Sequence, residues 1–204
     1  MKPDITSSEK ELIKKALAIA SKNSFSALSQ TLSKKIKTLK SEVDILSIKD
    51  LIQTFYPYTD KPIVTWVKVE NRIQNTIFVL SRENDILRLA DVALHKDYGF
   101  YKSLSDENVS VIKQICDLII GYFIDAEIKL FADNFEQSRP ELSVNPARAV
   151  EFFGFKDVYS QKFLVLTTGF SIDNSIECKI FLIFKANEKN EIIKRIEENI
   201  HLIS

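Results

Sequence analysis

Residues 76–89 read TIFVLSRENDILRL, a β-branched and aromatic run that changes into an amphipathic helical pattern after the polar residues around Asn84. The same order recurs in KIFLIFKANEKNEIIKRI at residues 179–196, where Asn190 and an acidic residue precede the helical pattern. The spacing across the turn differs by a few residues, and any junction from strand to helix would share part of this pattern. The pair favours an internal duplication.

The elements expected around these two segments repeat in the same order. A long helix is predicted from a capping box at Ser8 and Glu11 toward Lys35, and a second from Ser105 to about Phe131. Further helices are predicted at 83–94 and 189–200, and strands at 43–48, 63–69, 76–81, 148–154, 162–172 and 175–185.

This order predicts an α+β fold with two pseudo-symmetric halves, each with a long helix packed on an antiparallel sheet. The halves are expected at 8–98 and 104–202, within a single domain of residues 1–204. A chain of 204 residues with 45% hydrophobic residues can bury a sizeable core. The sequence therefore favours a folded domain over disorder.

Charge and hydropathy exclude several classes of partner. Lys plus Arg and Asp plus Glu number 28 each, so no overall charge attracts nucleic acid or anionic lipid. The N-terminal run MKPDITSSEK lacks the apolar core of a signal peptide, and no apolar run approaches the roughly 18 residues of a membrane span. We therefore expect a cytoplasmic protein without membrane insertion.

The cysteines and histidines do not predict a metal or cofactor site. Cys116 and Cys178 each lie in an apolar run, which is typical of buried thiols in a reducing compartment. His95 and His201 are far apart in the sequence, and no cysteine pair has the spacing of metal ligands. Both histidines are expected at the surface.

The second long helix contains an unexpected polar pair. Residues 111–125 read VIKQICDLIIGYFID, and most of this run predicts a buried helix. Gln114 and Asp117 lie three residues apart within it, and Gly121 follows one turn beyond Asp117. Positions three or four residues apart share a helix face, so a polar partner is expected to meet this face.

The run NSFSALSQTLSKKI at residues 23–36 resembles the first-helix signature of the CheC/CheX/FliY phosphatases. The match is carried by Asn23, Ala27, Leu28, Ser29, Lys34, Lys35 and Ile36. In that family each of two pseudo-symmetric halves begins with a long helix, as the internal repeat also predicts. The resemblance covers nearly the whole chain.

The family's active motif is a Glu, two residues, an Asn, and a Pro after twenty-two further residues. On the second long helix these positions fall on Gln114, Asp117 and Pro140. The resemblance implies that Gln114 and Asp117 occupy the catalytic positions, and that Gly121 and Pro140 bind the partner, with Gly121 leaving room for its backbone. In the first helix the corresponding positions are Lys15 and Ala18, which carry neither acid nor amide.

In the family, the Asn amide orients the attacking water at the aspartyl phosphate of CheY, and the Glu contacts a lysine of this response regulator. Gln114 lacks the charge for that contact, and Asp117 replaces an amide donor by an acceptor-only carboxylate. A carboxylate beside a phosphoryl group adds negative charge to the transition state. The resemblance therefore implies weak or altered phosphatase activity.

The leading hypothesis is a chemotaxis or two-component signalling protein that binds a CheY-like receiver domain through Gln114 and Asp117. A second hypothesis is a catalytically silent module that assembles with itself, as a homodimer, or with flagellar or receptor machinery. Alternatively, the two side chains are solvated or bonded to a neighbouring strand and serve no site. A small-molecule ligand is a third hypothesis for function, although no glycine-rich phosphate loop, nucleophile elbow or metal motif supports it.

Overall fold

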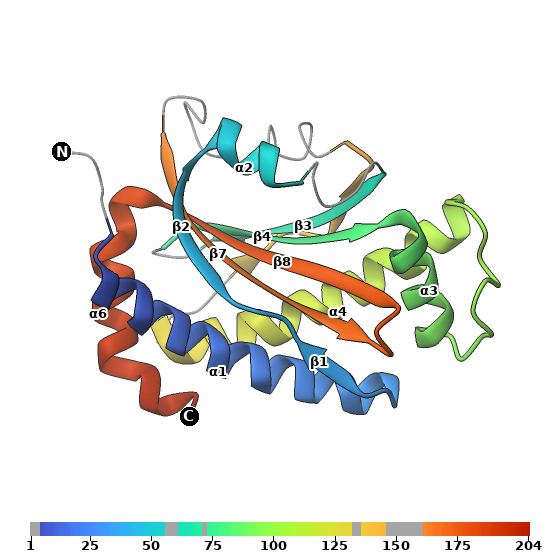
Figure 1. Ribbon diagram of the computed structural model, residues 1–204, viewed down its shortest axis with the longest axis horizontal. Coiled ribbons are helices and arrows are strands. Elements are labelled where there is room, and N and C mark those ends of the chain that lie inside the picture. Colours follow the sequence, from blue (N-terminus) through green and yellow to red (C-terminus); the bar gives the residue numbers. More distant parts are fainter. Residues whose placement is uncertain (1–4, 56–60, 71–72, 132–135, 146–160) are drawn as a thin grey trace.

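Two long helices lie side by side along one face of an antiparallel sheet (Figure 1). The computed structural model describes residues 5–55, 61–70, 73–131, 136–145 and 161–204. The long helices are α1 (Ser7–Leu32) and α4 (Asp106–Phe131). Their starting points agree with the predicted starts near Ser8 and Ser105.

Shorter helices surround this pair. Helices α3 (Glu83–Ala93) and α6 (Lys189–Asn199) both contact α4, and α6 also contacts α1. Helix α2 (Ile48–Phe55) packs on the other face of the sheet, and two short 3₁₀ turns, η2 (Ala186–Glu188) and η3 (Ile200–Leu202), flank α6. The α+β class is confirmed.

The described residues form one eight-stranded sheet whose strands pair only in antiparallel fashion. The strands are β1 (Ile36–Thr38), β2 (Glu42–Ser47), β3 (Pro62–Glu70), β4 (Asn75–Arg82), β5 (Glu136–Gln137), β6 (Glu141–Ser143), β7 (Lys162–Ile172) and β8 (Ile176–Lys185). Their order is β1-β7-β8-β4-β3-β5, with β2 also on β7 and β6 also on β3.

This order exchanges the outer strands between the two parts of the chain. The N-terminal β1 and β2 pair with the C-terminal β7, whereas the C-terminal β5 and β6 pair with the N-terminal β3. The central pair, β4 with β8, places Phe78 opposite Phe181. The two parts therefore share one sheet, and their pseudo-symmetry and the boundaries 8–98 and 104–202 stay predictions.

The central strands are apolar on both sides because helices cover both faces of the sheet. In β3, Ile63 and Val67 join the core under α1 and α4, while Val64 and Trp66 face the core under α2. Successive side chains of a strand point to opposite faces, so a strand covered on both sides lacks the usual polar alternation. This explains why the strands read as continuous apolar runs.

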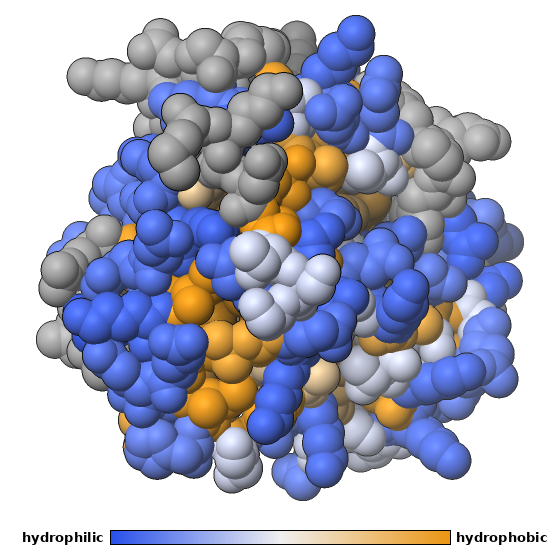
Figure 2. Space-filling model, turned by 60° about the vertical axis from the view of Figure 1, so that its left-hand side comes forward, coloured by the Kyte–Doolittle hydropathy of each residue, from blue (hydrophilic) through white to orange (hydrophobic). Residues whose placement is uncertain are grey.

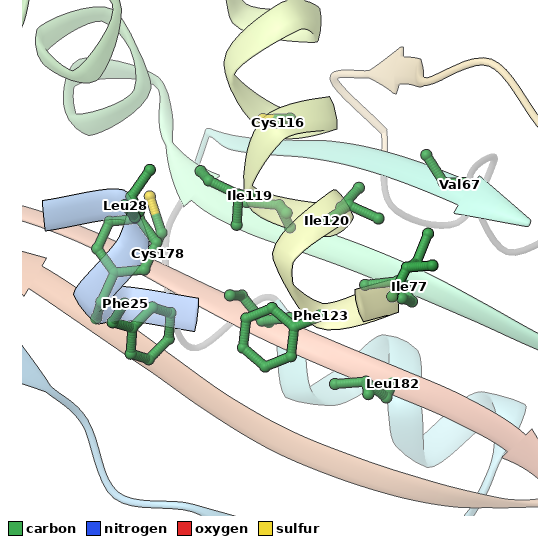
Figure 3. Packing of buried hydrophobic residues seen from close by; sticks show 14 of the residues in the cluster. Phe25, Leu28, Val67, Ile77, Cys116, Ile119, Ile120, Phe123, Cys178 and Leu182 are labelled. Atoms are coloured by element: carbon green, nitrogen blue, oxygen red, sulfur yellow. The ribbon is translucent and has the colours of Figure 1, made fainter. Parts of the chain in front are cut away.

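Aromatic side chains connect the long helices to the sheet. The Phe25 ring from α1 packs against Phe123 of α4 and Phe170 of β7, with ring centroids 5.6 and 5.2 Å away. Figure 3 shows these helices and the sheet contributing to one core, which also buries both Cys116 and Cys178. On the face shown in Figure 2, hydrophilic side chains cover most of the surface and apolar ones gather in a central band.

The ends of α1 differ from the sequence prediction. The capping box is formed by Thr6 and Glu9: the Glu9 amide donates to Thr6 Oγ1, and the Thr6 amide donates to a Glu9 carboxylate oxygen. The prediction of Ser8 and Glu11 was wrong because both pairs fit the same pattern and Glu9 gains an additional ion pair with Lys189. The helix ends at Leu32, where Ser33 adopts a left-handed conformation, rather than continuing toward Lys35.

Most other elements lie within a few residues of their predicted positions. The short strands β1, β5 and β6 were missed, because two or three residues carry no periodic pattern. Helix α2 was also missed, because its segment was interpreted as turn-rich. The strand predicted at 148–154 lies outside the described residues.

Candidate functional site on helix α4

Helix α4 begins with reciprocal capping bonds. The Ser105 amide donates to Asn108 Oδ1 at 2.8 Å, and the Asn108 amide donates to Ser105 Oγ at 3.4 Å. The Asn108 side chain also donates to the Ser103 carbonyl at 2.7 Å. The two bonds between Ser105 and Asn108 satisfy amide groups that a helix N-terminus leaves free, so they stabilise the start of the helix.

One face of α4 is buried and the opposite face carries the predicted pair. Ile112, Cys116 and Ile119 pack into the core, whereas Gln114 is exposed and Asp117 is half-buried. Positions three residues apart differ by about 60° around a helix, so both side chains can address one partner. The sequence prediction did not include Leu118, which lies beside them with 37% of its surface exposed.

The carboxyl group of Asp117 has an unusual environment. Its Oδ1 is inaccessible to solvent and has no hydrogen-bond partner. Burial raises the pKa of Asp117 above its ordinary value, so the carboxyl keeps its proton to a higher pH than an exposed aspartate. No ion pair with a basic side chain is found for Asp117 among the described residues.

Gly121 lies one turn after Asp117 and leaves open space. A Cβ atom built on Gly121 would have no atom within 4 Å outside its own helix and chain neighbours. The next residue, Tyr122, is held to α1, since its hydroxyl bonds Thr31 Oγ1 at 2.8 Å and its carbonyl accepts from Ser24 Oγ at 3.0 Å. The surface around Gly121 is therefore open, and hydrogen bonds between α4 and α1 hold the backbone next to it in place.

Pro140 directly precedes β6, a strand that contacts α4 and pairs with β3. Its side chain is half-buried. The predicted approach of Pro140 to Asp117 stays a prediction.

The matching face of α1 lacks comparable chemistry. Lys15 and Ala18 are both exposed, and neither supplies a carboxylate or an amide. Asn23 instead has a structural role, because its Nδ2 donates to the Ile203 carbonyl at 2.8 Å and ties α1 to the C-terminal segment. The Asn23 position of the α1 signature is thus explained by a structural hydrogen bond.

Hollows among the described residues lie outside the predicted site. A groove of about 160 Å³ between α1 and α4 is lined by Asn23, Ser24, Ala27, Tyr122, Asp125, Ala126, Lys129 and Ile203. A larger hollow, about 580 Å³, is lined by Lys61, Arg82, Glu83, Asn84, Asp85, Arg88 and Ser175. The larger one shares no residue with the α4 face, and Arg82 is paired with Asp85 at 2.6 Å. Size therefore does not identify the site.

The described residues contain no group of three or more His, Cys, Asp or Glu side chains that could hold a metal ion. Both cysteines are free and buried, and burial raises the pKa of the Cys116 thiol to about 12. His95 and His201 are exposed, as predicted. No helix among the described residues is long and apolar enough to cross a membrane.

Comparison with known proteins identifies the fold. No protein-family model matches the chain, and neither does the sequence of any curated protein. Several solved structures do match. FliY from Thermotoga maritima has a TM-score of 0.74 and 15% identity, with 95% of this chain and 98% of that chain covered.

Two further solved structures are similar to this chain. FliM in a FliM–SpeE complex from H. pylori has a TM-score of 0.71 and 8% identity, with 96% of this chain and 98% of that chain covered. A chemotaxis protein CheX from Desulfovibrio desulfuricans has a TM-score of 0.53 and 12% identity, with coverages of 85% and 99%. The resemblance predicted from residues 23–36 is therefore confirmed at the level of the fold, and this chain has the fold of the CheC/CheX/FliY family.

Proposed function

We propose that this chain is a chemotaxis or two-component signalling protein that binds a CheY-like receiver domain through α4. The docking face consists of Gln114, Asp117, Leu118 and Gly121. The observation that carries the proposal is the solvent side of this helix, where two polar side chains and an exposed leucine lie beside a glycine with open space. A soluble signalling partner in the cytoplasm fits this role.

The composition of the docking face suits a protein surface. Leu118 supplies apolar area, Gln114 can both donate and accept hydrogen bonds, and the Asp117 carboxyl accepts them. Gly121 lets a partner's backbone approach the helix more closely than any larger residue would. Because Asp117 Oδ1 is inaccessible to solvent, a donor from the partner would bond the other carboxylate oxygen, Oδ2.

The same face is poorly equipped for phosphatase chemistry. Ionised Asp117 cannot donate a hydrogen bond to an attacking water, and it would repel a phosphoryl group. Ala18 on α1 offers no substitute. We therefore propose binding with slow or altered turnover of the aspartyl phosphate, with catalytic silence as the limiting case.

A silent interaction module is the second candidate function. It is favoured by the absence of an amide at both Asp117 and Ala18, and by the structural similarity to FliY and to FliM in the FliM–SpeE complex. In that case the partner would be a component of flagellar or receptor machinery, or a second copy of this chain.

Binding of purified receiver domains, with and without a phosphoryl mimic, tests the proposal. Leu118→Glu should reduce binding at least tenfold, because it places a charge within the docking face. Leu202→Glu is the matched control, since Leu202 is another exposed leucine, with 50% of its surface accessible, outside that face. Equal loss in both variants, or binding to no receiver domain, would refute receiver docking at α4.

A further inference from the structure

A buried acid and a buried amide meet between α4 and β4, away from the docking face. Glu127 of α4 is 3% exposed and Asn75, the first residue of β4, is 2% exposed. Asn75 Nδ2 donates to Glu127 Oε2 at 2.9 Å. This bond joins the last turns of the helix to the beginning of a central strand.

Two acceptor atoms of this pair have no partner. Glu127 Oε1 and Asn75 Oδ1 are both inaccessible to solvent and form no hydrogen bond. An ionised carboxylate only accepts hydrogen bonds, so it cannot satisfy the Asn75 oxygen. A protonated carboxyl adds one donor, and a hydrogen bond from Glu127 to Asn75 Oδ1 would satisfy both groups.

The surroundings also disfavour a charge on Glu127. The small cavity beside it is lined by apolar side chains from α1, α6, β7 and β8, among them Leu17, Ile192, Leu166 and Phe184. The described lining residues from these elements are neither charged nor titratable, and Asn75 of β4 donates the hydrogen bond that Glu127 accepts. Burial raises the pKa of Glu127 to about 8, and the hydrogen bond from Asn75 opposes this shift.

We propose that Glu127 is a proton-dependent latch between α4 and β4. In the folded protein at neutral pH its carboxyl is protonated and joined to Asn75 by two hydrogen bonds. Loss of the proton to solvent leaves an unpaired charge in an apolar core and weakens the attachment of the helix. This device does not depend on the proposed receiver binding.

The direction of the pH effect follows from the pKa. The folded value, about 8, is higher than the ordinary value of 4.5. The stabilisation is therefore complete below the ordinary pKa and is lost as the pH rises through the folded pKa. Between about pH 6 and about pH 8, the unfolding equilibrium constant should rise roughly 50-fold from this group alone.

Urea unfolding of the full chain and of Glu127→Gln at these two pH values tests the latch. Glutamine can both donate to and accept from Asn75 without ionising, so the variant should lack the 50-fold rise. His95 and His201 are exposed in both proteins, and the comparison therefore cancels their titration. Equal pH dependence in the two proteins would overturn the proposal.

A second measurement covers the case in which Glu127→Gln fails to fold. Wild-type protein labelled with isotopes at its glutamate carboxyl carbons should show one carboxyl signal in the NMR spectrum that titrates near or above neutral pH. Asn75→Leu removes the amide partner, and in this variant that signal should change more than the other glutamate signals. Titration of every glutamate carboxyl below about pH 5.5 would overturn the proposal.

Discussion

Restoring the family's catalytic pair at Gln114 and Asp117 should raise the rate at which the proposed docking face removes a phosphoryl group from a receiver domain. The double change is Gln114→Glu with Asp117→Asn. In the structure, Asp117 Oδ1 is inaccessible, so the exposed part of the carboxyl is Oδ2. An asparagine that keeps its oxygen in the buried place presents its NH₂ group outward, where it can donate to water.

The size of the effect follows from this exchange of acceptor for donor. One well-placed orienting group is typically worth about 10²–10⁴-fold in rate, which corresponds to about 2.7–5.4 kcal/mol of barrier. Removing the carboxylate charge beside the phosphoryl group acts in the same direction. We expect Asp117→Asn to carry most of the gain, and Gln114→Glu to strengthen contact with a lysine of the receiver.

The assay is loss of the phosphoryl group from a receiver domain that binds the wild-type protein. Wild type, both single changes and the double change are compared at equal occupancy of the complex. Asp125→Asn is the control, because Asp125 is an exposed carboxylate two turns further along α4. Wild-type turnover equal to that of the double variant would refute the expected gain, and wild-type turnover above it would make Asp117 itself a working catalytic group.

Two further predictions concern stability. Phe25→Ala should lower the free energy of unfolding by about 3–5 kcal/mol, because Phe25 is 3% exposed and packs on Phe123 and Phe170. Phe100→Ala, at a side chain 57% exposed, should change it by less than about 0.5 kcal/mol in the same urea titration, and equal losses would contradict the packing described for α1. Gly169→Ala should lower the melting temperature, with a cost of about 1–3 kcal/mol, because its Cβ would lie 2.5 Å from the Cys178 carbonyl oxygen. Calorimetry showing no loss for Gly169→Ala would mean that β7 and β8 are less closely spaced than in this structure.

The sequence predicts the parts of the fold that depend on local patterns. The long helices α1 and α4 follow from helical periodicity, and strands β3, β4, β7 and β8 follow from runs of β-branched and aromatic residues. The exchange of outer strands could not be predicted in this way, because β1 and β2 find their partner in β7 more than a hundred residues later. Pairing over that distance depends on the completed sheet and leaves no local pattern.

The candidate site, like the fold, could be predicted from the sequence only in part. Helical spacing was sufficient to place Gln114 and Asp117 on one face, and the structure confirms that they are exposed and half-buried, respectively. Spacing could not predict that Oδ1 of Asp117 is isolated, because that depends on how closely neighbouring side chains pack. The pair of Glu127 and Asn75 was also missed, since the two residues are 52 positions apart and nothing in either local pattern marks them as partners.

Substitutions at Gly121 test most directly the central claim that the solvent side of α4 is a docking surface. Gly121→Ala adds one methyl group into open space and should stabilise the helix by about 0.5–1 kcal/mol. Gly121→Trp can fold for the same reason, but its ring would cover the surface between Asp117 and the following turn. The dissociation constant for a phosphorylated receiver domain should stay within about threefold of wild type for the alanine variant and rise more than about tenfold for the tryptophan variant. Wild-type affinity in a folded Gly121→Trp protein would contradict docking at this face.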